Sequence, residues 1–383
     1  MKIMFAIASI VPILILLLLD SSLFPLPWPD DSAFILAGVD WWQGSGIYRM
    51  FSQSPFVRTY DQHNFNTMPL LPVLTGLLAK LGVDSIRGMR VPGALAFGLF
   101  ATGLGYLRYR RLARTDFRAK AEAALFMSII LGWPIFRWGF GVLRPEVWNS
   151  LTLLALLLVS SNPNERIRRV VSTCALAAGA YIHFEAIYWV PVAMVVLLPD
   201  RFSYRELDYW KTYACSLLKV AAGVLLLLSP WLIYALTHFD AFQIQFSAQF
   251  GRLSEGRTLP TNLRALVDLV FSTTGNPVGI PKSFNPVKWA AIVLAAILIF
   301  PPRLNQAWDR TVFSAWIATG SAGLLWCRHP EMWFSTLLHA AFFGLLAIRL
   351  TPTNRFGIPR LVGFGLCALL TTFSGYQQFS DAN

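Results

Sequence analysis

Residues 3–31 read IMFAIASIVPILILLLLDSSLFPLPWPDD, and this stretch decides how the rest of the chain is interpreted. Its first part, residues 3–19, is uncharged, strongly apolar and long enough to cross most of the hydrocarbon core of a bilayer. Two adjacent carboxylates, Asp30 and Asp31, then follow a proline-rich segment, at about the depth where hydrocarbon gives way to water. Charge at that depth costs free energy and usually serves a function. The pair therefore predicts chemistry at a membrane surface.

The composition of the whole chain is that of a membrane protein. It has 383 residues, of which 55% are hydrophobic and 14% are charged, and its mean hydropathy is +0.53. A soluble protein carries about a quarter charged residues. Apolar segments recur along the entire length, and backbone groups in lipid must be hydrogen-bonded within their own segment, which favours helices. We expect an all-α integral membrane protein, folded as a single polytopic domain over residues 1–383 without a separate soluble domain.

The net charge of +12 does not indicate nucleic-acid binding, because the basic residues are spread between apolar segments rather than gathered in a soluble domain. The four cysteines are isolated and lack the CxxC spacing of zinc sites. They predict neither a metal site nor a disulfide framework, and we interpret them as small apolar packing residues.

Strongly basic loops are expected on the cytoplasmic side of a membrane. The basic segments of this chain are 108–120, 164–169, 200–211, 301–310 and 349–360. The N-terminus begins Met-Lys before its apolar run, and no small-residue cleavage site follows that run, so we expect a retained signal anchor. With all five basic loops inside, the N-terminus is predicted to be cytoplasmic and the C-terminus to lie outside.

This topology predicts about eleven transmembrane helices. They cover residues 3–19, 88–107, 121–136, 147–160, 168–183, 185–199, 212–236, 287–301, 311–327, 332–349 and 359–375. Two long outer segments remain, residues 20–87 and 237–286. A full span at 68–82 would place the basic loop at 108–120 outside. We therefore expect MPLLPVLTGLLAKLGV, like the earlier DSAFILAGVDWW, to form a helix on the outer interface.

Two interpretations of Asp30 and Asp31 stay open. Either residue can be the N-cap of the helix that follows, where a carboxylate accepts backbone N–H bonds and faces the positive end of the helix dipole. Alternatively, the pair supplies a general base that takes a proton from an acceptor hydroxyl.

Arg144, Pro145 and Glu146 stand at the predicted outer start of the span at 147–160. Pro and Glu are ordinary residues at a helix start. Arg144 and Glu146, with Arg137 in the loop before them, are also expected at the same level as the aspartates. Because arginine pairs with phosphate oxygens through a planar fork, this patch suits a phosphate ester as substrate.

Two further constellations interrupt apolar sequence on the predicted outer side. His183 and Glu185 lie in AAGAYIHFEAIYWVP, where such a histidine is either hydrogen-bonded filler or part of a site. With Glu146 and the aspartates they could bind a divalent cation, although the spacing specifies no metal. Arg328 and His329 lie in CRHPE between two late spans. The candidate substrate-binding residues are therefore Arg137, Arg144, His183, Glu185, Arg328 and His329.

The order of these features resembles that of a known family. One span, an acidic pair and a long outer loop are followed by MPLL at 68–71, LG at 81–82 and RVPGAL at 90–95. The chain is similar in this respect to the polyprenyl-phosphate-dependent GT-C glycosyltransferases, above all the protein O-mannosyltransferases and the lipid A aminoarabinose transferases. The family's corresponding pattern reads P-P-L-L-x-W-L, then L-F-G, then R-L-P-S-A-L.

The resemblance implies a GT-C-like fold and the transfer of a sugar from a polyprenyl phosphate to an acceptor hydroxyl, with inversion. The reaction is expected on the outer face of a bacterial inner membrane. The resemblance assigns the catalytic acid to Asp30, with Asp31 where the family has Glu, and a second acid to Glu146 after Arg144. Because Asp31 departs from the family's Glu, it stays open which aspartate is the base.

The implied partners are a polyprenyl-phosphate-linked sugar donor, an acceptor glycan, lipid or protein, and the bilayer itself. A late basic residue that binds the lipid phosphate corresponds in this chain to Arg328 or His329. The alternative is a transporter or flippase that binds an anionic lipid-linked substrate without cleaving it. Transporters often have internal repeats and broken helices near the midplane. This sequence shows no repeat and gathers its polar residues at one face, which favours the enzyme.

Overall fold

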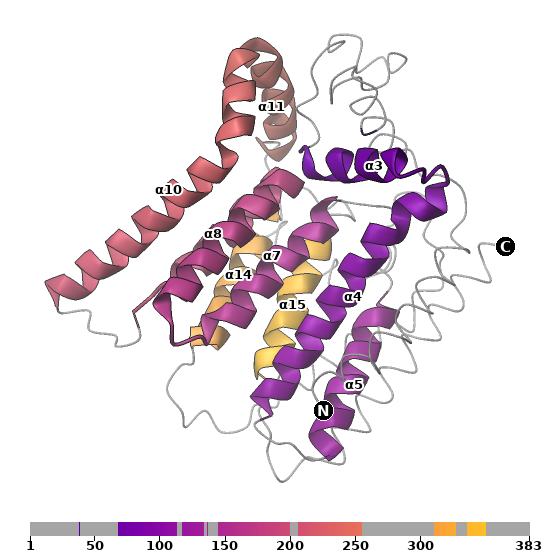
Figure 1. Cartoon of the computed structure of the whole chain (residues 1–383). Coiled ribbons are helices and arrows are strands. Elements are labelled where there is room, and N and C mark those ends of the chain that lie inside the picture. Colours follow the sequence, from indigo (N-terminus) through magenta and orange to yellow (C-terminus); the bar gives the residue numbers. More distant parts are fainter. Residues whose placement is uncertain are drawn as a thin grey trace.

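The protein is a helical bundle with one helix lying across its end (Figure 1). The computed structural model describes residue 38 and residues 68–112, 117–133, 136, 145–199, 206–254, 310–326 and 335–349, and every regular element in these ranges is a helix. In chain order the elements are α3 (Leu70–Lys80), α4 (Ile86–Arg111), α5 (Phe117–Gly132), α7 (Pro145–Ser160), α8 (Glu165–Ile182), the 3₁₀ helix η1 (Phe184–Trp189), α9 (Val190–Val196), α10 (Leu207–Thr237), α11 (Phe239–Ser254), α14 (Arg310–Trp326) and α15 (Ser335–Arg349).

Local sequence explains where several helices begin and end. Ser85 caps α4 by accepting the Gly88 N–H at 3.1 Å, and Asn164 caps α8 by accepting the N–H groups of the two residues that follow Glu165. Short polar side chains of this kind satisfy the unpaired donors of a first helical turn. At a helix C-terminus, α3 ends at Lys80 because Gly82 takes a left-handed backbone conformation with φ of 84°. This reversal sends the chain directly into α4.

The core of the bundle is built around α7, which packs against α4, α8, α14 and α15. Its sequence PEVWNSLTLLALLLVS is apolar on every side over residues 153–159, as expected of a helix surrounded by others. Two glycines let neighbours approach closely, since a Cβ at Gly344 would lie 2.6 Å from Leu157 Cδ1 and one at Gly103 would collide with Leu154. Small residues at such contacts are typical of helices packed in a membrane.

An aromatic cluster joins α4, α5 and α15. The ring centroids of Phe100 and Phe136 are 5.0 Å apart, and those of Trp133 and Phe343 are also 5.0 Å apart, both in edge-to-face geometry. All four side chains are buried. Rings packed in this way stabilise an interface beyond the apolar area that they bury.

The predicted turn at His183 between two closely spaced segments is confirmed. Helix α8 ends at Ile182, His183 is extended, and the chain then continues through η1 and α9. The second segment differs from the predicted span at 185–199, because it starts as a 3₁₀ helix and is α-helical only over Val190–Val196.

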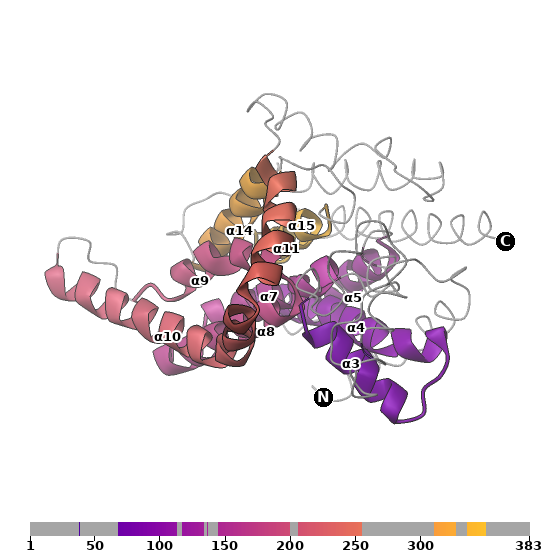
Figure 2. The ribbon, with the colours of Figure 1, turned by 90° about the horizontal axis from the view of Figure 1, so that it is seen from above.

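Helix α10 runs along the flank of the bundle beside α8 (Figure 2). Among the described residues it is the one helix long and apolar enough to cross a membrane. Large apolar side chains are exposed along its outer flank, including Leu218, Leu225, Leu226, Ile233 and Leu236. Such a surface is suited to lipid rather than to water.

Helix α11 lies in residues 237–286, which the sequence predicted as an outer segment without assigning a helix there. Its aromatic residues explain the difference, because they pack on each other and on the end of α10. Phe242 stacks on Phe246 with ring centroids 4.9 Å apart, and it meets Trp231 of α10 edge-to-face at 5.7 Å. These are tertiary contacts, and a local pattern search does not detect them.

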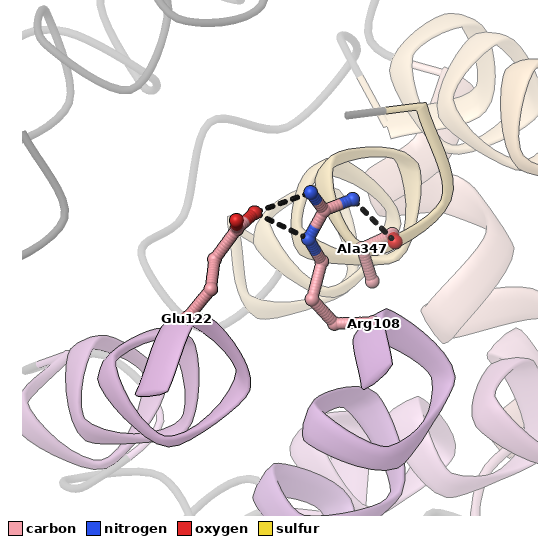
Figure 3. A network of polar contacts seen from close by, with 3 residues as sticks. All are labelled: Arg108, Glu122 and Ala347. Atoms are coloured by element: carbon pink, nitrogen blue, oxygen red, sulfur yellow. Dashed lines mark hydrogen bonds and ion pairs between the residues drawn. The ribbon is translucent and has the colours of Figure 1, made fainter. Parts of the chain in front are cut away.

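A buried ion pair joins three helices at the end of the bundle away from α3 (Figure 3). The Arg108 side chain of α4 is 0% exposed and donates from Nε to Glu122 Oε1 of α5 at 3.0 Å, while its Nη2 also pairs with this oxygen. Its Nη1 donates to the carbonyl of Ala347 in α15 at 3.5 Å. The basic loop predicted at 108–120 is therefore shorter, since α4 extends to Arg111 and Arg108 is a structural cation.

Replacing Glu122 by Gln removes this counter-charge from a buried guanidinium. We expect E122Q to lower the free energy of unfolding by about 3–5 kcal/mol, because the desolvation cost of the cation is no longer offset. Thermal or denaturant unfolding of the purified protein in detergent micelles measures the change.

The exposed ion pair between Lys211 Nζ and Asp208 Oδ1, 3.2 Å apart on α10, provides the matched control. Removing it with D208N should leave the stability nearly unchanged, because solvent screens the pair. A double variant, R108M/E122L, should recover most of the loss seen in E122Q, since it buries no charge. Wild-type stability of E122Q would contradict a clamping role for the pair.

Candidate active site

The candidate residues with described side chains gather at the end of the bundle covered by α3, which we call the α3 end. Helix α3 lies across this end, where α4 begins and α8 ends (Figure 1), and it contacts both of these helices. Arg90 of the RVPGAL motif is in the second turn of α4 and is buried.

His183 and Glu185 form a buried pair at the turn after α8. The distance between His183 Nδ1 and Glu185 Oε2 is 3.4 Å. The Glu185 side chain is 0% exposed and the histidine is 8% exposed. Burying a carboxylate costs several kcal/mol unless it is paired, so the imidazole and the carboxylate depend on each other for their place in the structure.

Asn149 connects this turn to α7. Its Nδ2 donates to the backbone carbonyl of His183 at 3.3 Å. The first turns of α7, which contain Pro145 and Glu146, therefore lie beside the His183 turn. The sequence analysis did not single out Asn149. The one sign of it in the sequence is a polar amide three residues after Glu146, at the start of an apolar helix.

A second residue that sequence analysis missed is His339. It is buried in α15, and its ring centroid lies 5.8 Å from that of Trp133. The only signal in the sequence was a histidine inside the otherwise apolar stretch LLHAAFFGLLAI.

The other predicted site residues are not part of this described group. Asp30, Asp31, Arg137, Arg144, Arg328 and His329 lie outside the described residues. Glu146 is helical in the first turn of α7, and its side chain is likewise outside the description. Within the described ranges no group of three or more His, Cys, Asp or Glu residues could hold a metal ion. His183 and Glu185 alone do not complete a metal site, so the divalent cation stays a prediction.

Gly38 links the segment after the acidic pair to α3. A Cβ on Gly76 would collide with the backbone carbonyl of Gly38, and one on Gly38 would collide with the backbone of Pro72 and Gly76. Gly38 follows Asp31 by seven residues.

The described helices share their fold with a class of integral membrane glycosyltransferase structures. The particular structures that the chain resembles are two crystal structures of ArnT from Cupriavidus metallidurans. It matches ArnT bound to undecaprenyl phosphate with a TM-score of 0.65 and apo ArnT with a TM-score of 0.63, both at 14% sequence identity. Each match covers 93% of this chain and 62% of the ArnT chain. The sequence matches no protein-family model and no curated protein.

At 14% identity the match establishes a shared fold, which agrees with the predicted all-helical architecture, while the number of about eleven transmembrane helices stays a prediction. This chain spans 62% of the length of ArnT, so the match by itself does not establish the activity or the partners of this chain.

The Gly38 contact gives a direct test of the α3 end. We expect Gly76→Ala to lower the free energy of unfolding by about 1–3 kcal/mol, because the new methyl group meets backbone atoms that cannot rotate away. Unfolding in detergent micelles measures the effect.

Gly320 in α14 is the matched control, since a Cβ there would have no heavy atom within 4 Å. Gly320→Ala should raise the stability by about 0.5–1 kcal/mol, because alanine loses less backbone entropy in a helix. A G76A protein as stable as G320A would show that Gly38 does not rest on α3.

Proposed function

We propose that this chain is a membrane glycosyltransferase that moves a sugar from a polyprenyl phosphate to an acceptor hydroxyl on the outer face of the membrane. The observation that carries the proposal is the match of 93% of the chain to ArnT, of which one structure holds undecaprenyl phosphate. A buried, paired His183 and Glu185 at the α3 end supports a site there. Polyprenyl phosphate is an anionic head on an apolar tail, which suits a site at the membrane surface.

The proposed orientation has the α3 end outside and the N-terminus in the cytoplasm of a bacterium. Arg110 at the end of α4 and Arg166 at the start of α8 are exposed at the opposite end of the bundle. An excess of arginine and lysine on the cytoplasmic side is the rule for multi-pass proteins. In this orientation the sugar is transferred where nucleotide sugars are not expected, which explains a lipid-linked donor.

In the proposed reaction, Asp30 or Asp31 takes the proton from the acceptor hydroxyl. The hydroxyl oxygen then attacks the anomeric carbon, and the bond from that carbon to the phosphate oxygen breaks. Polyprenyl phosphate leaves with the electron pair of this bond, and the anomeric centre is inverted. Glu146 is the second acid of the site.

Negative charge grows on the phosphate as it leaves, so cationic groups placed there lower the barrier. The proposed groups are Arg137, Arg144, Arg328 and His329. His183 joins them in the proposal, with Glu185 orienting the imidazole through Nδ1. The contact with a substrate oxygen is then made by Nε2.

The proposal predicts that one aspartate of the pair is essential. Purified protein in liposomes should release polyprenyl phosphate from at least one member of a panel of polyprenyl-phospho-sugars. Asp30→Asn or Asp31→Asn should reduce the rate by about 10²–10⁴, because the general base is lost. The release assay is run on both variants after their folding has been checked by thermal unfolding.

Asp20 at the end of the first apolar run is the matched control, and Asp20→Asn should retain the wild-type rate. Equal activity in D30N and D31N would show that the pair is structural. Tight binding of donors without release, in the presence of a broad acceptor mixture, would support the transporter or flippase instead.

A further inference from the structure

We propose that Asn149 is a positioning residue that sets the geometry of the His183–Glu185 pair from the neighbouring helix. The inference rests on the proposed function, in which this pair contacts the donor phosphate. Neither the resemblance nor the sequence pattern singles out Asn149.

The backbone carbonyl of His183 accepts two hydrogen bonds. One comes from the N–H of Ala186 at 3.1 Å and belongs to the first turn of η1, and the other comes from Asn149 Nδ2 at 3.3 Å. The N–H of His183 donates to the carbonyl of Gly179 at 2.8 Å and ends α8. The two peptide groups that flank His183 are thus both hydrogen-bonded, and the carbonyl of the second one accepts one of its bonds from a different helix.

This peptide controls both members of the pair. It joins His183 to the residue before Glu185, so a rotation of its carbonyl moves the start of η1 relative to the imidazole. The two side chains meet at 3.4 Å across this single turn. A small rotation of the peptide therefore separates Nδ1 from the carboxylate. By fixing the carbonyl, Asn149 fixes the distance between the two ionisable groups.

Packing alone does not account for an amide at this position. Asn149 is 0% exposed, and among the described residues its Oδ1 has no hydrogen-bond partner. A buried amide with one unpaired atom is less favourable than an apolar side chain of similar volume, such as the leucines that fill the rest of α7. What a leucine lacks is the N–H donor aimed at the His183 carbonyl.

The facing helix is shaped to admit the amide. A Cβ on Gly179 would lie 3.2 Å from Asn149 Oδ1 and 2.5 Å from Thr152 Oγ1. Thr152 itself donates to the carbonyl of Ala175 at 3.3 Å. The close approach of α7 to α8 at Gly179 therefore places Asn149 within reach of the turn, and an alanine there would collide with Thr152 and also press on the amide of Asn149.

The first test monitors the His183–Glu185 pair by NMR and does not depend on turnover. The protein has five histidines, so a ¹⁵N-histidine NMR spectrum in lipid is simple, and His183→Gln identifies the His183 signals by their loss. The Nδ1 signal reports its contact with the carboxylate. We expect Asn149→Leu and Gly179→Ala to shift this signal. Ser150→Ala, a buried polar change on the same helix whose hydroxyl bonds only within α7 among the described contacts, should leave it in place.

The second test uses the affinity for undecaprenyl phosphate. Asn149→Leu should weaken binding by about tenfold, as expected for coupled neighbouring groups. In the H183Q background the same change should have almost no further effect, because a positioning residue acts through the residue that it positions. If N149L folds poorly, Asn149→Ser replaces it in this test. Serine shortens the side chain without adding apolar bulk, and we expect it to weaken binding to the same extent.

Unchanged His183 signals in N149L, N149S and G179A would overturn the inference. So would an equal loss of affinity from N149L in the wild-type and H183Q backgrounds, because Asn149 would then act independently of the pair. If the wild type binds no undecaprenyl phosphate, the proposed function fails. The ¹⁵N signals of His183 would then still show whether Asn149 sets the geometry of the His183–Glu185 pair.

Discussion

The close approach of α7 and α8 is the contact on which the rest of the described site depends. Ala175, Gly179 and His183 are spaced by four residues and form one line along the end of α8. Asn149 and Thr152, three residues apart on α7, donate to the carbonyls of the first and last of these positions, and Gly179 between them gives the room. In a lipid environment no water replaces such bonds when they are lost, so they fix the two helices strongly.

The two ends of the bundle use their polar groups differently. At the end away from α3, charges and hydroxyls are used within the structure itself. Arg108 pairs with Glu122, Arg168 donates to the carbonyl of Asn162 at 2.6 Å, and Ser160 donates to Thr311 at 2.9 Å. These contacts hold loops and helix ends together. The α3 end instead pairs an imidazole with a carboxylate on a single turn.

Much of the helical pattern follows from the sequence because lipid admits few alternatives. The spans predicted at 88–107, 147–160 and 168–183 overlap α4, α7 and α8 to within a few residues at each end. The turn at His183 was also predictable, since two polar residues interrupted an apolar stretch there. These features depend on local composition and on the requirement that every backbone group in a membrane be hydrogen-bonded.

The features that the sequence did not reveal depend on partners far away in the chain. Arg108 was expected to be one of several loop cations, and its burial depends on Glu122 and on a carbonyl of α15. Helix α11 depends on ring contacts with Trp231. Of the candidate site, the nearness of His183 to Glu185 follows from their spacing, whereas the role of Asn149 requires a carbonyl that lies 34 residues further along the chain. The acidic pair and the arginines stay predictions from sequence.

The hydrogen bond from Asn149 to the His183 carbonyl and the burial of Glu185 are physically linked. A carboxylate with no exposed surface is tolerated only if its partner stays at a fixed distance, because the desolvation cost is constant while the attraction falls as the partner moves away. The hydrogen bond from Asn149 is a second restraint on the carbonyl that begins this turn. Asn149 adds a bond from a helix that is itself packed on six of the described elements, so the turn is tied to the core. The proposed site, which would hold a phosphate where hydrocarbon meets water, needs this rigidity, since mobile charged groups there would be drawn toward the solvent.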